Sequence, residues 1–254
     1  MFDARSEPPA RHTARPSDPP PVNAFARRAL AALDGLEVRR VGDGEEREAL
    51  MRFRYDCYRA AGHVAPCESG RIEDEYDDVP GVMRFAVAHE GRVVSSVRLN
   101  FIDRDRRRSM SVATFPDVLH PMLDMGFAMI DPTRFTIDSA VSRELPALPY
   151  LTLRVVIMAC MHFGSDYALS LIRPAHRAFY ERVFGAAELA GERACESVSF
   201  PVCLHAIDMG LRLPDMCRKY PFFHAMADEC ETLFGPASPL THTAKPTARE
   251  AIGA

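Results

Sequence analysis

The sequence contains no tryptophan, no Cys-x-x-Cys pair and no apolar run of the length that crosses a bilayer. A transmembrane helix needs about 20 consecutive apolar residues, so no membrane span is expected. The amino terminus also lacks the apolar core that a secretory signal peptide requires. These absences predict a cytoplasmic protein.

The cysteines are also uninformative about redox or metal chemistry. There are seven of them, an odd number, and their scattered positions favour neither a disulfide framework nor a zinc ribbon. His63, Cys67 and Asp74 can be imagined as metal ligands. Ordinary loop and core positions explain them as well, because no second ligand pair has matching spacing, and we predict no metal.

Charge excludes a further class of function. The formal net charge is −4, which argues against general affinity for nucleic acid. A local basic loop contains Arg104, Arg106, Arg107 and Arg108, but no aromatic residues are interleaved with these arginines. We therefore predict no nucleic-acid partner.

The two ends of the chain differ from its middle. Segment 1–22 is rich in proline and poor in large apolar residues, and 236–254 has a similar Pro/Thr/Ala character. Both are predicted to be disordered. Hydrophobic residues make up 47% of the chain, which is enough to fill the core of a single domain over 23–235.

Periodicity and turn signals within that domain predict an α/β fold. Strands are expected at 36–41, 82–89, 93–101, 135–142, 166–172 and 197–207. Helices are expected at 23–33, 43–61, 115–123, 150–163 and 174–184, with helical stretches over 214–234. Hairpin strands followed by βαβα units predict a central mixed, mostly antiparallel sheet flanked by helices.

The most informative segment is Arg-Pro-Ala-His-Arg-Ala-Phe-Tyr-Glu-Arg-Val-Phe-Gly, which runs from Arg173 to Gly185. It is typical of a strand end, a tight turn, a short helix and a glycine stop. The order resembles the second half of the acyl-donor site in the GNAT superfamily of N-acyltransferases. That resemblance implies a GNAT-like three-layer fold, in which two neighbouring parallel strands separate to admit a pantetheine arm.

The first half of the domain adds independent motifs. An Arg-x-x-x-aromatic helix, an Asp-x-x-Asp loop, a Ser-x-x-Arg-Leu strand and a strand ending in Ser-Arg follow one another. The matching residues are Arg54, Tyr58, Asp74, Asp77, Arg98, Ser142 and Arg143. Together they resemble the N-acyl amino acid synthase and acyl-homoserine-lactone synthase branch of the superfamily.

The sequence departs from that branch in three ways. Ala140 stands where the Glu-x-Ser-Arg strand would have its glutamate, although Asp138 falls on the same face of the predicted strand. The tryptophan of the lactone synthases is missing. The glycine-rich pyrophosphate loop is also missing, and Pro146 and Pro149 remove amide donors from this region.

The resemblance implies transfer of a fatty acyl group from a thioester to the amine of an amino acid or similar small molecule. An acyl carrier protein (ACP) or coenzyme A (CoA) would present the acyl group as a co-substrate, and no tightly bound cofactor is expected. The missing pyrophosphate loop favours acyl-ACP over acyl-CoA. The basic loop of Arg104, Arg106, Arg107 and Arg108 is a possible docking surface for the acidic carrier, and a solvated loop is the alternative.

Site roles follow from the same resemblance. Tyr180 is the candidate general acid for the leaving thiolate, with simple packing as the alternative. Asp74 and Asp77 are candidates for holding the acceptor's ammonium group or helping to deprotonate it, with a solvated acidic loop as the alternative. A buried Arg98 would need a carboxylate partner, and we expect a charged cluster of Asp74, Asp77, Arg98, Asp138 and Arg143. Substrate-binding candidates are Arg54, Tyr58, Ser142, Arg143, Arg173 and His176.

Three other functions remain open at this point. They are an autoinducer-type lactone synthase, an acetyltransferase that uses acetyl-CoA, and a non-catalytic acyl-binding module of the same fold. Apolar residues offer walls for an acyl tunnel, with ordinary core packing as the alternative. They lie in helix 150–163 and at Met122, Met125, Phe127 and Met129.

Overall fold

A computed structural model describes residues 23–235, and its central element is a seven-stranded sheet in the order β1-β2-β3-β4-β5-β7-β6. The strands are β1 (Leu36–Val41), β2 (Val82–His89), β3 (Arg92–Ile102), β4 (Met129–Ile137), β5 (Tyr167–Ile172), β6 (Ala187–Arg193) and β7 (Val202–Asp208). Only β4 and β5 pair in parallel; the other neighbours are antiparallel. The predicted mixed, mostly antiparallel sheet is confirmed. The segments 1–22 and 236–254, predicted to be disordered, lie outside the described residues.

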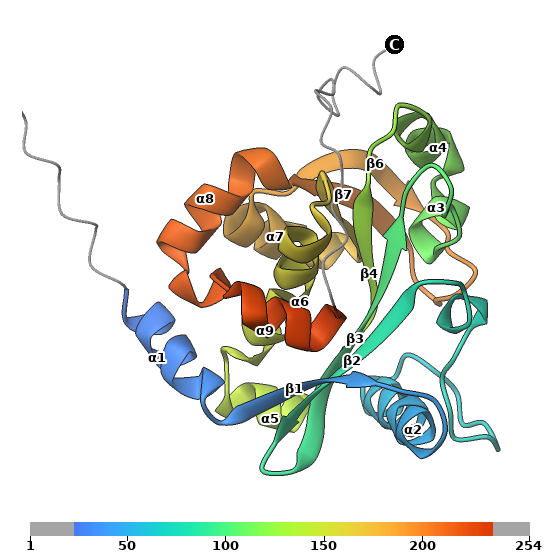
Figure 1. The fold of residues 1–254 in the computed structure, drawn as a ribbon. Helices are drawn as coiled ribbons and strands as arrows, with labels where there is room; N and C mark the ends of the chain where they lie inside the picture. The colour runs from blue at the N-terminus through green and yellow to red at the C-terminus, as the bar shows by residue number, and fades with distance from the viewer. Residues whose placement is uncertain (1–22, 236–254) are drawn as a thin grey trace, which may run out of the picture.

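Helices cover both faces of this sheet (Figure 1). One side carries α1 (Ala24–Leu33), α6 (Leu148–Phe163), α7 (Arg177–Phe184), α8 (Met209–Lys219) and α9 (Ala227–Phe234). The other side carries α2 (Glu45–Ala60), α3 (Met110–Thr114) and α4 (Pro116–Asp124). Short elements complete the described chain: α5 (Ser139–Glu144) and the 3-10 turns η1 (Glu75–Asp77), η2 (Pro174–His176) and η3 (Pro221–Phe223).

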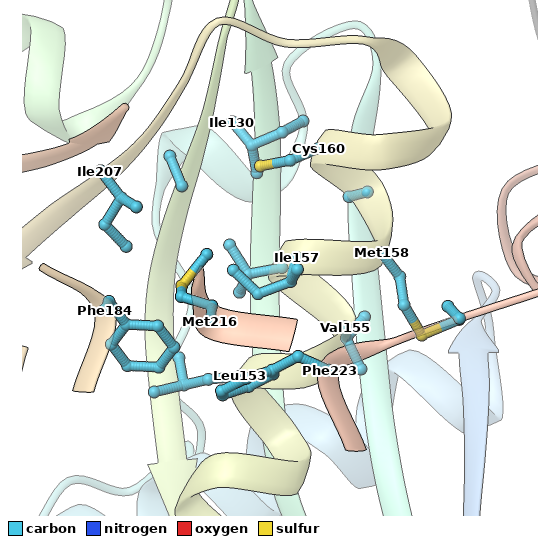
Figure 2. Close-up of a cluster of buried hydrophobic side chains, with 14 of the residues drawn as sticks. Ile130, Leu153, Val155, Ile157, Met158, Cys160, Phe184, Ile207, Met216 and Phe223 are labelled. Carbon is cyan, nitrogen blue, oxygen red and sulfur yellow. The ribbon is translucent and has the colours of Figure 1, made fainter. Parts of the chain in front are cut away.

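The central helix α6 is apolar nearly all round and is buried, as its sequence predicts. Its side chains meet those of the sheet and of the C-terminal elements in one cluster. Figure 2 shows Ile157 of α6, Ile130 of β4, Phe184 of α7 and Phe223 of η3 within this cluster. Among residues 23–235, no helix is both long and apolar enough to cross a bilayer.

The main correction to the predicted elements concerns β4. The predicted strand 135–142 is wrong in position: the strand runs from Met129 to Ile137, and α5 follows it. Asp138 ends the strand because its side chain accepts hydrogen bonds from the amides of Ala140 and Val141 and caps α5. Pro132 hides the first half of the strand from a sequence-based reading, since proline is rare inside a sheet.

Three further elements differ from the prediction. The short helix α3 and the edge strand β6 were not predicted, and β7 begins at Val202 rather than at 197. The burial pattern of β6 is mostly exposed or half-exposed, so it lacks the apolar alternation that marks a strand in sequence.

The phenylalanine cluster gives a test of the core. Phe223 is fully buried, and its ring centroid lies 5.4 Å from that of Phe184. We expect Phe223→Ala to lower the free energy of unfolding by about 3–5 kcal/mol, because a large cavity would remain. Leu211→Ala on α8, where the side chain is 63% exposed, should change it little. Denaturant unfolding of the full chain measures both, and equal effects would contradict this packing.

Candidate functional site

The parallel strands β4 and β5 pair over only two residues and then diverge. Met129 pairs with Tyr167 and Ile130 with Ala168, and no later pair joins the two strands. A cavity of about 590 Å³ lies where they separate. The predicted separation of two neighbouring parallel strands is therefore confirmed.

Segments far apart in the sequence line this cavity. Helix α2 and the loop after it contribute Cys57, Tyr58, Ala61 and His63, and α3 contributes Met110. The strands contribute residues 132–137 of β4 and 170–172 of β5, and Arg173 and His176 follow β5. The rest of the lining is Pro149 and Leu153 of α6, Phe179 and Tyr180 of α7, and Val198, Phe200 and Val202 before β7 and at its start. Most of this lining is apolar. Of the methionines, Met110 lines the cavity, whereas Met122 and Met129 pack in a core cluster and Met125 is exposed.

A bulge in β4 shapes the cavity wall. Ser96 pairs with Thr136 and Arg98 with Thr133, so β4 uses one more residue than β3 across this interval. Arg134 lies in the bulge with φ 50°, in the left-handed region that residues other than glycine seldom occupy. The extra residue turns β4 away from regular pairing beside the gap.

Arg134 belongs to a buried network of charges under the same strands. Asp77 Oδ1 lies 2.9 Å from Arg54 Nη1, and both side chains are fully buried. Arg98 Nη1 lies 3.0 Å from Asp77 Oδ2 and 2.5 Å from Asp74 Oδ1. Arg134 donates to Asp74 Oδ2 through Nε at 2.9 Å. The predicted carboxylate partner of Arg98 is confirmed, twice over.

Local structure explains why the Asp-x-x-Asp spacing delivers both carboxylates to the network. Asp74 caps η1 by accepting from Tyr76 N, while Asp77 accepts from Asp74 N. This reciprocal capping box points both side chains inward. The neighbouring Glu73 and Glu75 are exposed, so only the outer part of this acidic segment is a solvated charge run.

The network sets the charge states of its members. Burial alone would raise the pKa of Asp74, but hydrogen bonds and charges from Arg98 and Arg134 outweigh burial and lower the pKa. Burial likewise would lower the pKa of Arg134, whereas Tyr58 and Asp74 beside it raise that pKa. Both groups are therefore charged at neutral pH.

The network includes residues that the sequence-based assignment missed. Ser142 and Arg143 lie on α5, and neither lines the cavity. The acid-x-hydroxyl-arginine order occurs instead on β4 itself, as Asp131-Pro132-Thr133-Arg134. Thr133 accepts from Arg98 Nε at 2.9 Å. This order is visible in the sequence, but the predicted strand 135–142 begins after it.

Asp131 occupies the acidic position of that pattern. Its carboxyl group is fully buried and accepts from Ser111 Oγ at 2.7 Å. Burial raises its pKa, and the hydrogen bonds from Ser109 and Ser111 only partly offset this. Asp131 therefore takes the place that the sequence-based reading gave to Ala140 and Asp138.

The expected cluster of five charges is thus partly wrong. Asp74, Asp77 and Arg98 meet as predicted, but Asp138 and Arg143 do not join them. Asp138 caps α5 and pairs with Arg92 at 2.7 Å, and Arg143 is exposed. The reason is the early end of β4, which turns both residues into a helix away from the network.

The remaining predicted residues divide into three groups. Tyr58, Arg173, His176 and Tyr180 line the cavity, and Arg54 is buried beneath it in the network. Burial raises the pKa of Tyr180, so its phenol keeps its proton at neutral pH. In the basic loop, Arg106, Arg107 and Arg108 pair with Asp103, Asp124 and Glu75, and Arg104 donates to the carbonyl of Asp124.

The Arg54–Asp77 pair gives a test of the network. Arg54→Met would leave the fully buried Asp77 with one guanidinium instead of two, and we expect a loss of about 3–5 kcal/mol in the free energy of unfolding. Arg52→Met is the matched control on the same helix, since Arg52 is exposed and pairs only with Glu48; its effect should be small. Similar losses in the two variants, measured by denaturant unfolding, would contradict the role of burial.

The sequence matches the family described as N-acyl amino acid synthase FeeM over residues 49–208, a range that contains every residue of the cavity lining. A search of curated protein sequences gives no match.

Solved structures share the fold at low sequence identity. FeeM, an N-acyl amino acid synthase from uncultured soil microbes, superposes with a TM-score of 0.59 at 16% identity, over 69% of this chain and 92% of that one. BjaI, a CoA-dependent acyl-homoserine lactone synthase solved with SAM and isopentyl-CoA, gives 0.51 at 16% identity, over 85% and 99%. TofI, in a ternary complex with an inhibitor and MTA, gives 0.52 at 14% identity, over 77% and 99%.

The family match spans more than half of the chain and extends from α2 to the end of β7. It coincides with the divergent strands, the cavity between them and the buried charges beneath it. The chain accordingly belongs to the FeeM family of N-acyl amino acid synthases and is an N-acyltransferase.

Proposed function

We propose that this enzyme transfers a fatty acyl group from a carrier-protein thioester to the amine of an amino acid. The observation that carries the proposal is the cavity between β4 and β5, which has Tyr180 from α7 in its lining together with Arg134 from β4. The mainly apolar lining suits a pantetheine arm and an acyl chain. A single cavity that takes up donor and acceptor removes the need for an acyl-enzyme intermediate.

The proposed reaction is a direct aminolysis. The acceptor nitrogen attacks the thioester carbonyl carbon, the C–N bond forms and the C–S bond breaks. The acceptor first gives its ammonium proton to solvent and attacks as the free amine, and its nitrogen loses one more proton to solvent as the amide forms. The leaving sulfur takes one proton from Tyr180, which is later reprotonated from solvent. The developing oxyanion is expected beside the bulged edge of β4, where backbone amides without a β5 partner are available.

Arg134 is the proposed ligand of the acceptor carboxylate. Its Nε and Nη2 atoms are bound to Asp74, Tyr58 lies beside it, and Nη1 makes a long contact of 3.5 Å with the carbonyl oxygen of Ser197. Nη1 therefore retains the capacity to bind an anion in the cavity. Asp74 and Asp77 are better suited to positioning the arginines than to contacting the ammonium group, because each carboxylate is already committed to two guanidinium groups.

Two rival activities fit the same lining less well. A lactone synthase would have to admit the sulfonium cation of S-adenosylmethionine, whereas Arg173, which is ion-paired with no carboxylate of the described residues, makes the cavity wall cationic. A non-catalytic binding module is the second rival, and the match to the N-acyl amino acid synthase family argues against it. Both remain outcomes of the assay below.

The start of α6 supports a carrier protein over coenzyme A. A helix normally offers several free amides in its first turn, and these bind phosphates. Here Leu148 N donates to Leu145 O, and Pro149 has no N–H. Few donors are left for a pyrophosphate, so we propose acyl-ACP as the main donor and acyl-CoA as the weaker one. The cytoplasmic location predicted from the sequence is part of this proposal.

The function is tested by incubating the full chain with acyl-ACP and pooled amino acids and identifying N-acyl products by mass spectrometry. We expect an N-acyl amino acid, and Tyr180→Phe should lower kcat by about 10²–10⁴-fold. Tyr55→Phe is the control, since Tyr55 lies on α2 outside the lining and only accepts from Cys67 N. S-adenosylmethionine is included as a competing acceptor. A homoserine-lactone product, or thioester binding without any amide product, would overturn the proposal, and full activity of Tyr180→Phe would remove its general-acid role.

Donor preference is tested by comparing the same acyl chain on the carrier and on coenzyme A. We expect kcat/KM to be at least about tenfold higher with the carrier, because steering by charge adds to the encounter rate.

The proposed docking surface is the loop of Arg104, Arg106, Arg107 and Arg108, which leads to Met110 in the cavity lining. Replacing the four arginines by glutamine should lower carrier-dependent kcat/KM and weaken its salt dependence, with acyl-CoA turnover as the control. An unchanged salt dependence would reject this docking surface, and equal kcat/KM for both donors would reject the carrier preference.

A further inference from the structure

The cavity lining contains a second cation whose charge no carboxylate of the described residues balances. Arg173 follows the end of β5, and its guanidinium stacks over the ring of Phe200 at 4.5 Å. Its Nη1 lies 3.3 Å from His63 Nε2. Arg54, Arg98 and Arg134, by contrast, are each ion-paired with Asp74 or Asp77. Arg173 is held in place without being neutralised.

The contact between Arg173 and His63 sets which of the two side chains donates and which accepts. Arginine has donors and no acceptor, so Arg173 donates and Nε2 of His63 accepts. Nδ1 of His63 is then the ring nitrogen that can donate to a ligand. Arg173 and His63 together present hydrogen-bond donors, and Arg173 adds a positive charge.

The surroundings of Arg173 are electropositive. The larger cavity is lined by no aspartate or glutamate of the described residues. Burial lowers the pKa of the nearby His176, and Arg173 and His63 lower it further, as expected beside an unneutralised cation. The part of the cavity around Arg173 therefore suits an anionic ligand.

The position of Arg173 relates this place to the acceptor. His63 and Phe200 also line a smaller hollow of about 280 Å³, together with Tyr58, Arg134 and the acidic Glu196. These residues come from α2, from the loop after it, from β4 and from the segment before β7, whereas Tyr180 comes from α7. Arg173 thus contacts the residues that surround Arg134, the proposed ligand of the acceptor carboxylate.

We propose that Arg173, with His63, binds a second acidic group of the acceptor. The preferred acceptor is then an amino acid with an acidic side chain, such as aspartate or glutamate, rather than a neutral one. This inference rests on the proposed function, because it assigns the α-carboxylate to Arg134 and the side-chain carboxylate to Arg173. A planar guanidinium binds a carboxylate through two parallel hydrogen bonds, which lysine cannot reproduce.

The experiment compares acceptors of matched shape and different charge. The full chain is assayed with acyl-ACP and, separately, glutamate, glutamine, aspartate, asparagine, tyrosine and leucine. We expect kcat/KM for glutamate to exceed that for glutamine, and kcat/KM for aspartate to exceed that for asparagine, by at least about tenfold. The amide has the shape of the acid but cannot form the ion pair with Arg173. In Arg173→Met this acid-to-amide ratio should fall by at least about tenfold, and Arg173→Lys should restore only part of it.

The ratio separates recognition from general damage, because a misfolded or misaligned site lowers turnover of both acceptors. Arg182→Met, an exposed arginine on α7 outside the lining, is the control and should leave the ratio unchanged. Equal kcat/KM for an acid and its amide, a preference for tyrosine, or an unchanged ratio in Arg173→Met would overturn the inference. The proposed function would survive each of these results, because it depends on the formation of an N-acyl amino acid and not on which amino acid is preferred.

One further arm tests whether the anion belongs to the donor instead. Acyl-pantetheine and acyl-phosphopantetheine differ only by the phosphate. If Arg173→Met reduced kcat/KM only with the phosphorylated thioester, for every acceptor alike, Arg173 would be a donor ligand and the inference would be wrong. We expect the effect of the substitution to follow the acceptor and not the donor.

Discussion

The architecture depends on the early parting of β4 and β5. A strand can leave its neighbour only if its other edge stays satisfied, since unpaired backbone groups are costly to bury. Here β5 pairs with β7 along its whole length, from Tyr167 opposite Asp208 to Ile172 opposite Cys203. On the far side β3 holds β4 through the bulge to Ile137. Each strand is anchored from outside, and the gap between them can remain open for a substrate.

Beneath the gap, buried charges add to apolar packing in joining α2 and η1 to the sheet. Ion pairs that are fully desolvated contribute little net stability, yet they fix geometry, because any displaced partner would leave a charge unpaired. Arg54, Asp77 and Arg98 form the enclosed part of this network, and Asp74 extends it to Arg134 at the cavity wall. These contacts hold the backbone of Arg134 in the left-handed conformation, which would be unfavourable for an arginine outside this network.

Much of this arrangement could be predicted from sequence, and the failures have physical causes. The strand position of Arg98 required a buried carboxylate, and the spacing of Asp74 and Asp77 supplied two. The location of β4 could not be predicted well: Pro132 lies on the edge that β5 has left, where the missing amide costs no sheet hydrogen bond. That error displaced the assignment from Arg134 to Arg143. The meeting of His63, Arg173 and Phe200 joins three distant segments, and no local pattern encodes it.

The origin of the cavity walls has a consequence for biosynthesis. Phe200 and Val202 lie just before and at the start of β7, and β7 is the partner that holds β5 in place along its length. A ribosome-bound chain that has emerged only as far as α7 already includes Tyr180, Arg134 and the acidic capping box. It still lacks one wall and the outer support of β5. Competence for substrate therefore requires the β6–β7 hairpin, which is synthesised after Tyr180, Arg134 and the capping box.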